Sequence, residues 1–70
     1  MADSAFTVPS YEKYSAIRDK EGFSDYYVAT GANITKSTFS DWKAGRSSPK
    51  IDKLLKIANF LDVAITDLLA

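Results

Sequence analysis

The polar side chains best suited to binding gather between residues 36 and 50 of this 70-residue chain. They combine cations, hydroxyls and one carboxylate: Lys36, Ser37, Thr38, Ser40, Asp41, Lys43, Arg46, Ser47 and Lys50. Lysine and arginine donate to phosphate oxygens, whereas serine hydroxyls and an aspartate carboxylate can pair with the edges of bases. This set of side chains is suited to binding a phosphate or a base, and not to catalysing the formation or cleavage of a covalent bond.

The chain contains neither cysteine nor histidine. It therefore lacks the commonest general base, the commonest nucleophile and the usual zinc ligands, and no disulfide can support a small core. We expect no catalytic residues, no cofactor and no metal. No apolar run approaches the roughly 20 residues that cross a bilayer, and the start MADSAFTVPS has neither a basic head nor an apolar stretch. These features predict a soluble cytoplasmic protein.

The formal net charge is zero, which by itself argues against a nucleic-acid partner. The charges are unevenly distributed, however. Residues 36–56 carry six lysine or arginine side chains against Asp41 and Asp52, whereas residues 1–35 and 57–70 are net acidic. Lysine and arginine commonly do no more than solvate helix surfaces, so this bias favours an anionic partner without establishing one.

Two short helices around a tight turn would position this cluster. Apolar residues at helical spacing give each helix one inward face: Val28, Ala29 and Ala32 on the first, Phe39 and Trp42 on the second. The first helix would follow Ser24 as its N-cap, and the second would span about 36–44 and end at Gly45. Between them, Gly31 and Asn33 accept a left-handed backbone and Thr35 offers a capping hydroxyl. This is the pattern of a helix-turn-helix motif, whose second helix usually enters the DNA major groove.

Three more helices would complete an all-α domain over residues 10–70, preceded by a flexible arm over residues 1–9. The first would span about 10–21 with Tyr14 and Ile17 inward, Pro9 in its first turn and Gly22 at its end. The fourth would begin with Ser48 as N-cap and Pro49 as first helical residue, and would be broken at Asp62 and Val63. The fifth would cover about 65–69.

Four ordered segments carry a family resemblance: IRDKEGFS at 17–24, Ala29, ITKSTFSDWKAGRSSP at 34–49 and IDKLLKIANFLDVAITDLL at 51–69. Together they resemble the lambda-repressor-like DNA-binding domains of the phage-repressor, Cro and XRE type, over residues 14–69. The resemblance implies a compact five-helix domain. Two positions depart from the family pattern: Asn33 replaces the usual turn glycine, and Ala64 replaces the usual cap of the fifth helix. We expect the turn to survive and the last helix end to be loose, with Thr66 partly substituting as its cap.

The resemblance also implies site residues. Bases would be contacted by Lys36, Ser37, Ser40 and Asp41, and phosphates by Ser24, Thr38, Lys43, Arg46, Ser47 and Lys50. Two alternatives stay open: Asp41 could instead pair with a nearby cation, and Lys36 could pair with Asp25. Trp42 is expected in the core. Tyr26 and Tyr27 are expected to face outward, and no role is assigned to Tyr11 or Phe6.

These features predict a sequence-specific regulator of transcription that binds double-stranded DNA, of phage or bacterial type. It would act as a homodimer on an inverted repeat, because one small module contacts too few base pairs to be specific. Some of the apolar surface of Ile65, Leu68 and Leu69, which lie beyond the motif, would supply the dimer contact. Repression is the expected outcome and activation the alternative. A second hypothesis is a protein-interaction module of the antitoxin or adaptor kind on the same fold.

Overall fold

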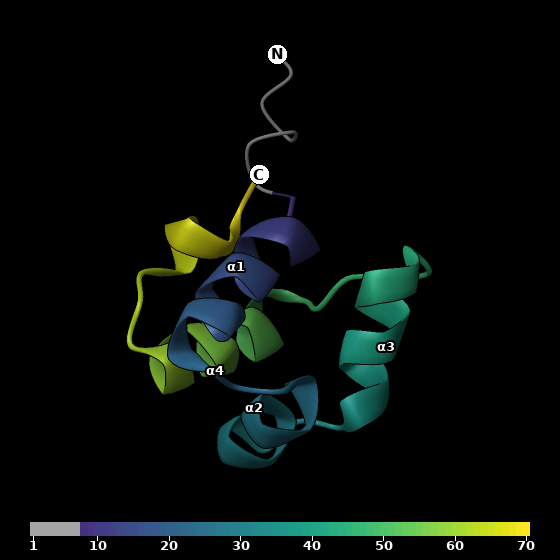
Figure 1. Ribbon diagram of the computed structural model, residues 1–70. Helices are drawn as coiled ribbons and strands as arrows, with labels where there is room; N and C mark the ends of the chain where they lie inside the picture. The colour runs from purple at the N-terminus through teal and green to yellow at the C-terminus, as the bar shows by residue number, and fades with distance from the viewer. Residues whose placement is uncertain (1–7) are drawn as a thin grey trace.

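The computed structural model describes residues 8–70, which form four α-helices and one short 3₁₀ helix (Figure 1). The elements are α1 Tyr11–Glu21, α2 Asp25–Ala32, α3 Lys36–Ala44, α4 Ile51–Leu61 and η2 Ile65–Leu68. Within these residues there is no strand, only an isolated antiparallel bridge between Pro9 and Leu69. The predicted all-α class is therefore confirmed. None of the described helices has the length and apolar character needed to cross a membrane.

The predicted fifth α-helix is wrong, because residues 65–68 form a single 3₁₀ turn. Leu69 leaves the helical conformation to pair with Pro9, and the Ala70 N–H donates to the Val8 carbonyl at 2.8 Å. The start of η2 is held by Asp67, whose carboxylate accepts from the Ala64 N–H at 3.3 Å, rather than by Thr66.

The same pairing changes the start of α1. Pro9 lies in the bridge and not in the first helical turn, and Ser10 is the N-cap, its hydroxyl accepting from the Lys13 N–H at 3.2 Å. Residues 1–7, which make up most of the predicted arm and include Phe6, lie outside the described residues.

Three of the four α-helices end where their sequences predict. Gly22 and Gly45 adopt positive φ after α1 and α3, and Asp62 does so after α4. In the turn of the motif, Asn33 takes φ 59°, so the expected tolerance of asparagine at this position is confirmed. The expectation for Gly31 is wrong, because Gly31 lies inside α2. A Cβ there would sit 2.0 Å from the Phe60 ring, so this glycine allows α2 to approach α4 closely.

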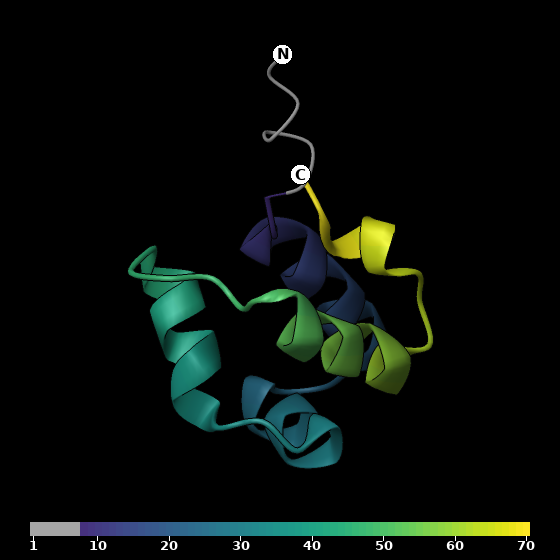
Figure 2. The ribbon, with the colours of Figure 1, turned by 180° about the vertical axis from the view of Figure 1, so that it is seen from behind.

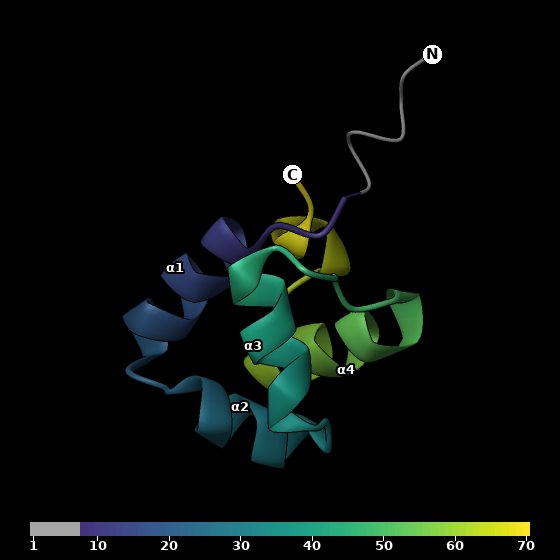
Figure 3. The same cartoon turned by 90° about the vertical axis from the view of Figure 1, so that its right-hand side faces the viewer.

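One core holds the helices together. It consists of Tyr14, Val28, Ala29, Ala32, Ile34, Phe39, Trp42, Leu54, Ile57, Ala58, Leu61 and Leu68. The Tyr14 ring stacks on Phe39 and on Trp42, with centroid distances of 5.1 Å in both pairs. Trp42 is buried, as predicted. Because Phe39 and Trp42 both point inward, α3 lies across the domain with α1, α2 and α4 behind it (Figure 3).

The apolar residues at the end of the chain belong largely to this core. Leu68 is fully buried, and Ile65 and Leu69 are half-buried and pack against the core. Most of this apolar surface is therefore used within one chain, and Leu68 leaves none of its surface for a contact between two copies.

Candidate nucleic-acid interface

The outward face of α3 is small and polar. Since an α-helix turns once every 3.6 residues, Ser37, Ser40 and Asp41 lie on the side opposite Phe39 and Trp42. Ser37 and Ser40 are exposed and Asp41 is half-buried, while Lys36 is exposed at the first position of the helix. The structure thus brings the four residues predicted to contact bases onto one accessible side of the second motif helix.

Ala44 shares that face, one turn beyond Ser40, and is also exposed. No role was predicted for Ala44 from the sequence, although its helical spacing from Ser37 and Ser40 was a usable signal. Its methyl group is the kind of side chain that contacts a thymine methyl group in the major groove.

The first turn of α3 carries a row of hydroxyls. Thr35 is the N-cap residue, as predicted, but its side chain makes no capping bond. Its hydroxyl instead lies 3.1 Å from the Thr38 hydroxyl and accepts from Ser37 at 3.3 Å. The backbone N–H groups at this end of α3 therefore lack a side-chain cap, and such groups attract anions.

Asp41 pairs with a cation, as one of the two open alternatives proposed. The Arg46 Nε donates to Asp41 Oδ1 at 2.9 Å. The Arg46 backbone N–H also donates to the Asp41 carbonyl at 2.9 Å, which ties the loop after α3 to the end of the helix. The Asp41 side chain is 42% exposed and the Arg46 side chain 65%. An ion pair this exposed contributes only about 0–1 kcal/mol and can open readily.

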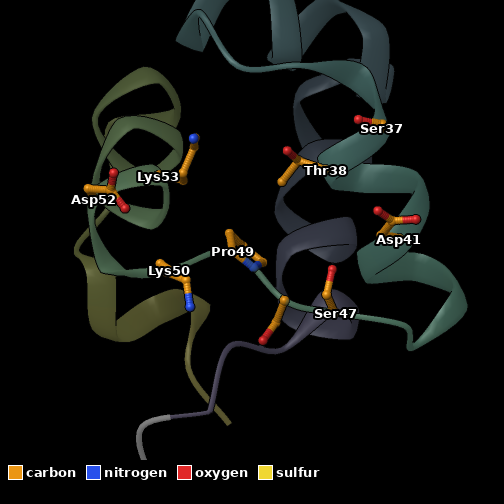
Figure 4. Close-up of a pocket in the computed structure, with 9 residues that line it drawn as sticks. Ser37, Thr38, Asp41, Ser47, Pro49, Lys50, Asp52 and Lys53 are labelled. Carbon is orange, nitrogen blue, oxygen red and sulfur yellow. The ribbon is translucent and has the colours of Figure 1, made fainter.

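A polar groove of about 260 Å³ separates α3 from the start of α4 (Figure 4). Its lining is Ser37, Thr38, Asp41, Ser47, Ser48, Pro49, Lys50, Asp52 and Lys53. Ser37, Thr38 and Asp41 come from α3, Lys53 comes from α4, and Ser47 and Lys50 lie in or at the end of the connecting segment (Figure 4). The groove therefore joins three of the predicted phosphate-binding residues, Thr38, Ser47 and Lys50, to two of the predicted base-contacting residues.

Ser48 and Lys53 are also in this groove and were not predicted. Lys53 follows Lys50 by three residues, a helical spacing that could have indicated it. The predicted start of α4 at Ser48 and Pro49 is wrong: Lys50 is the N-cap, and α4 begins at Ile51. Pro49 is buried, so it anchors the connecting segment instead of opening the helix.

The remaining predicted phosphate-binding residues lie apart from the groove. Lys43 is exposed near the end of α3, and Ser24 caps α2. The Ser24 hydroxyl accepts from the Tyr27 N–H at 3.0 Å, and a hydroxyl that accepts one bond can still donate its proton to a phosphate oxygen.

A hydrogen-bonded cluster fixes the first turn of α2 against α1. The Asp25 carboxylate accepts from the Tyr14 hydroxyl at 2.7 Å, the Tyr11 hydroxyl at 2.8 Å and the Arg18 guanidinium at 2.7 Å. Lys36 is therefore not the partner of Asp25, and that alternative is wrong. Tyr11, which had no predicted role, also packs edge-on against Trp42 with ring centroids 5.5 Å apart.

This cluster shifts the acid–base properties of its members. Burial alone would raise the pKa of Asp25, but the bonds from Arg18, Tyr14 and Tyr11 outweigh it and hold that pKa below its usual value. Burial and the bond to Asp25 raise the pKa of Tyr14. The Asp25 side chain therefore remains a carboxylate at neutral pH.

An aromatic patch lies on the outer side of α2. Tyr26 and Tyr27 are 65% and 53% exposed, so their predicted outward position is confirmed. The Tyr27 ring lies 4.6 Å from Phe23 and 5.7 Å from Phe60, centroid to centroid. Phe23 thus packs back onto the helix that it precedes, as residues before an N-cap often do.

Comparisons with known proteins agree with this geometry. The family model for helix-turn-helix domains matches residues 15–68. The fold is similar to that of the restriction-modification controller protein C.AhdI from Aeromonas hydrophila, with 20% identity, a TM-score of 0.77, and coverage of 99% of this chain and 100% of that one. It is also similar to a transcriptional regulator from Listeria innocua, with 24% identity, a TM-score of 0.69, and coverage of 84% of this chain and 55% of that one.

No curated protein sequence matches the chain. The two structural likenesses, at this identity, show the fold alone. The family match covers most of the chain and coincides with the turn at Asn33 and the polar face of α3. The chain belongs to the helix-turn-helix family of the lambda-repressor-like, XRE type, whose members are DNA-binding regulators of transcription.

Proposed function

We propose that this protein binds a specific double-stranded DNA sequence as a homodimer and regulates transcription from it, with repression as the main outcome. The observation that carries the proposal is the pairing of an exposed polar face on α3 with a lysine-bearing groove beside it. The structural likeness to a restriction-modification controller protein over its whole length supports a regulatory role. The protein would act in the cytoplasm of a bacterial or phage-infected cell, at the nucleoid when bound.

The two parts of the site would divide the work. Lys36, Ser37, Ser40 and Asp41 would contact base edges in the major groove, where hydroxyls can donate or accept and a lysine can donate to guanine. The phosphate contacts would come from Ser24, Thr38, Lys43, Arg46, Ser47 and Lys50, with Lys53 added from the groove. These cations would give binding its salt dependence, since each neutralised phosphate releases counterions.

The dimer contact would involve the outer side of α4. Ile51 and Leu55 are 64% and 45% exposed and lie one helical turn apart. Figure 2 shows α4 in front, with no other helix lying over it. Two copies related by a two-fold axis would each bury this pair of side chains, with contributions from the exposed parts of Ile65 and Leu69.

A protein-interaction module is the second candidate. The exposed rings of Tyr26 and Tyr27, extended by Phe23 and Phe60, favour it, because exposed aromatic clusters often mark a protein contact.

Selection of bound duplexes from a random pool, followed by a salt titration, tests the proposal against this alternative. We expect enrichment of an inverted repeat with half-sites about 10 base pairs apart, and affinity that falls steeply with salt. The absence of any enriched sequence, together with salt-insensitive binding, would favour the interaction module.

A further inference from the structure

Asp41 and Arg46 pair with each other through groups that would also contact DNA. Asp41 lies on the accessible side of α3 and lines the groove, and its Oδ1 is occupied by Arg46 Nε at 2.9 Å. A carboxylate near DNA is repelled by phosphates and by the acceptor atoms of bases. Arg46 binds that carboxylate through Nε alone, so its Nη groups stay free, but the pairing offsets its charge and weakens its attraction for a phosphate. While the two remain paired, neither side chain offers DNA its full charge or all of its hydrogen-bonding groups.

We propose that Asp41 and Arg46 exchange partners on the correct DNA sequence, so that recognition of one base releases one phosphate contact. The proposal rests on the proposed function. When a base with an exocyclic amino group faces Asp41, that donor replaces Arg46. Cytosine fits best, because its major-groove edge offers the N4 amino donor without a neighbouring acceptor. The freed guanidinium then binds a phosphate. On other sequences Asp41 still competes for Arg46, and that phosphate contact is weaker.

The local geometry allows this exchange without refolding. The Arg46 and Ser47 backbone N–H groups both donate to the Asp41 carbonyl, at 2.9 and 3.4 Å, so the backbone of the loop stays fixed. Only the Arg46 side chain has to move. It is 65% exposed, and therefore little packing is lost when it swings from the carboxylate to a phosphate.

The charges around the pair support the same conclusion. Lys50 and Lys53 line the groove together with Asp41 and Asp52. Removing the Asp41 charge would leave Lys50, Lys53 and a free Arg46 facing any duplex. Asp41 therefore restrains binding to incorrect sequences as well as selecting the correct one.

The experiment measures the salt slope, which is the steepness with which the logarithm of the affinity falls with the logarithm of the salt concentration. It is measured for the selected duplex and for a random duplex. The variants are Asp41→Asn, Arg46→Gln and the double change. Glu21→Gln and Lys20→Gln, exposed at the end of α1, are the matched controls for losing one negative and one positive charge. Circular dichroism checks that each variant is folded, and Arg46→Ala, which also removes the charge, replaces Arg46→Gln if that variant does not fold.

On the selected duplex, Arg46→Gln should lower the salt slope by about one, whereas on the random duplex it should change the slope no more than Lys20→Gln does. Asp41→Asn should strengthen binding to the random duplex, raise its slope by about one, and reduce the preference for cytosine at one position by roughly ten-fold. An equal loss of slope on both duplexes in Arg46→Gln would overturn the exchange and leave sequence-specific binding intact. If the parent protein selects no sequence, the proposed function fails and the exchange with it.

Discussion

Arg18 and Asp25 join α1 to the first turn of α2, with 2.7 Å between Arg18 Nη1 and Asp25 Oδ1. Both side chains are about one-fifth exposed, at 18% and 21%, in contrast to the exposed pair of Arg46 and Asp41. The contact is reinforced by the hydroxyls of Tyr11 and Tyr14, and Tyr14 in turn stacks on Trp42. The helix that begins the motif is thus held by the same residues that support the recognition helix α3.

Replacing Asp25 with Asn should lower the free energy of unfolding at pH 7 by about 1–3 kcal/mol, because the largely buried Arg18 charge loses its buried partner and keeps only the exposed Asp19 carboxylate. The pKa of Asp25 is lowered in the folded protein, so its contribution is fully present above the unfolded value of about 4 and is lost as the pH falls below it. Urea unfolding at several pH values should therefore show the difference between parent and Asp25→Asn shrinking in acid. Asp19→Asn, whose carboxylate also pairs with Arg18 but is 69% exposed, is the control and should change little. A pH-independent difference would contradict an ionised Asp25.

Gly31→Ala should destabilise the domain although alanine is the better helix former. A Cβ at residue 31 would meet the Phe60 ring at 2.0 Å, and crowding of this kind costs about 1–3 kcal/mol. Phe60→Leu should relieve most of that loss in the double variant, which chemical denaturation of all four proteins can measure. If Gly31→Ala were as stable as the parent, the Phe60 ring would have room to move aside, and its contact with residue 31 would not limit how closely α2 and α4 approach.

Lys53→Ala should weaken binding to every duplex by a similar factor and reduce the salt slope by about one, since a phosphate contact carries no sequence information. Lys56→Ala is the matched control, because Lys56 is exposed on the same helix but is not among the residues that line the groove. Equal effects of the two substitutions on binding would show that the groove has no special part in holding DNA.

Replacing Ile51 or Leu55 with Asp should dissociate a dimer formed through α4, because each copy would place a charge in the shared contact. Sedimentation equilibrium should then give the mass of one chain, while binding to a single half-site remains. Tyr26→Asp, which alters another exposed large side chain, should leave the mass unchanged. A dimer that persists in the Ile51 and Leu55 variants would place the contact elsewhere.

The sequence predicts the motif closely because local patterns determine it. The bounds 36–44 of α3, the left-handed Asn33 and the inward Phe39 and Trp42 follow from helical spacing and turn preferences. The misplaced elements depend on distant contacts instead. The 3₁₀ turn of η2 and the start of α1 are both set by the pairing of Pro9 with Leu69, two residues at opposite ends of the chain.

The same division holds for the site. The outward positions of Ser37, Ser40 and Asp41 could be predicted from the positions of the apolar residues on α3. The cluster around Asp25 could not, because its partners lie 7 to 14 residues away on a different helix. The groove was only partly predicted, since Lys53 lines it from α4, and its position opposite α3 depends on how the helices pack.

The central claim is that the outward face of α3 contacts bases, and a comparison of selected sequences tests it most directly. Ser37→Gln with Ser40→Ala changes two exposed side chains without removing a cation, and glutamine at residue 37 can make a paired contact with adenine. We predict that the double variant keeps its helical fold and its affinity for random duplex, but selects a different sequence, with a change of about 1–3 kcal/mol at the affected base pair. If parent and variant select the same sequence, these serines do not contact bases and the claim is wrong.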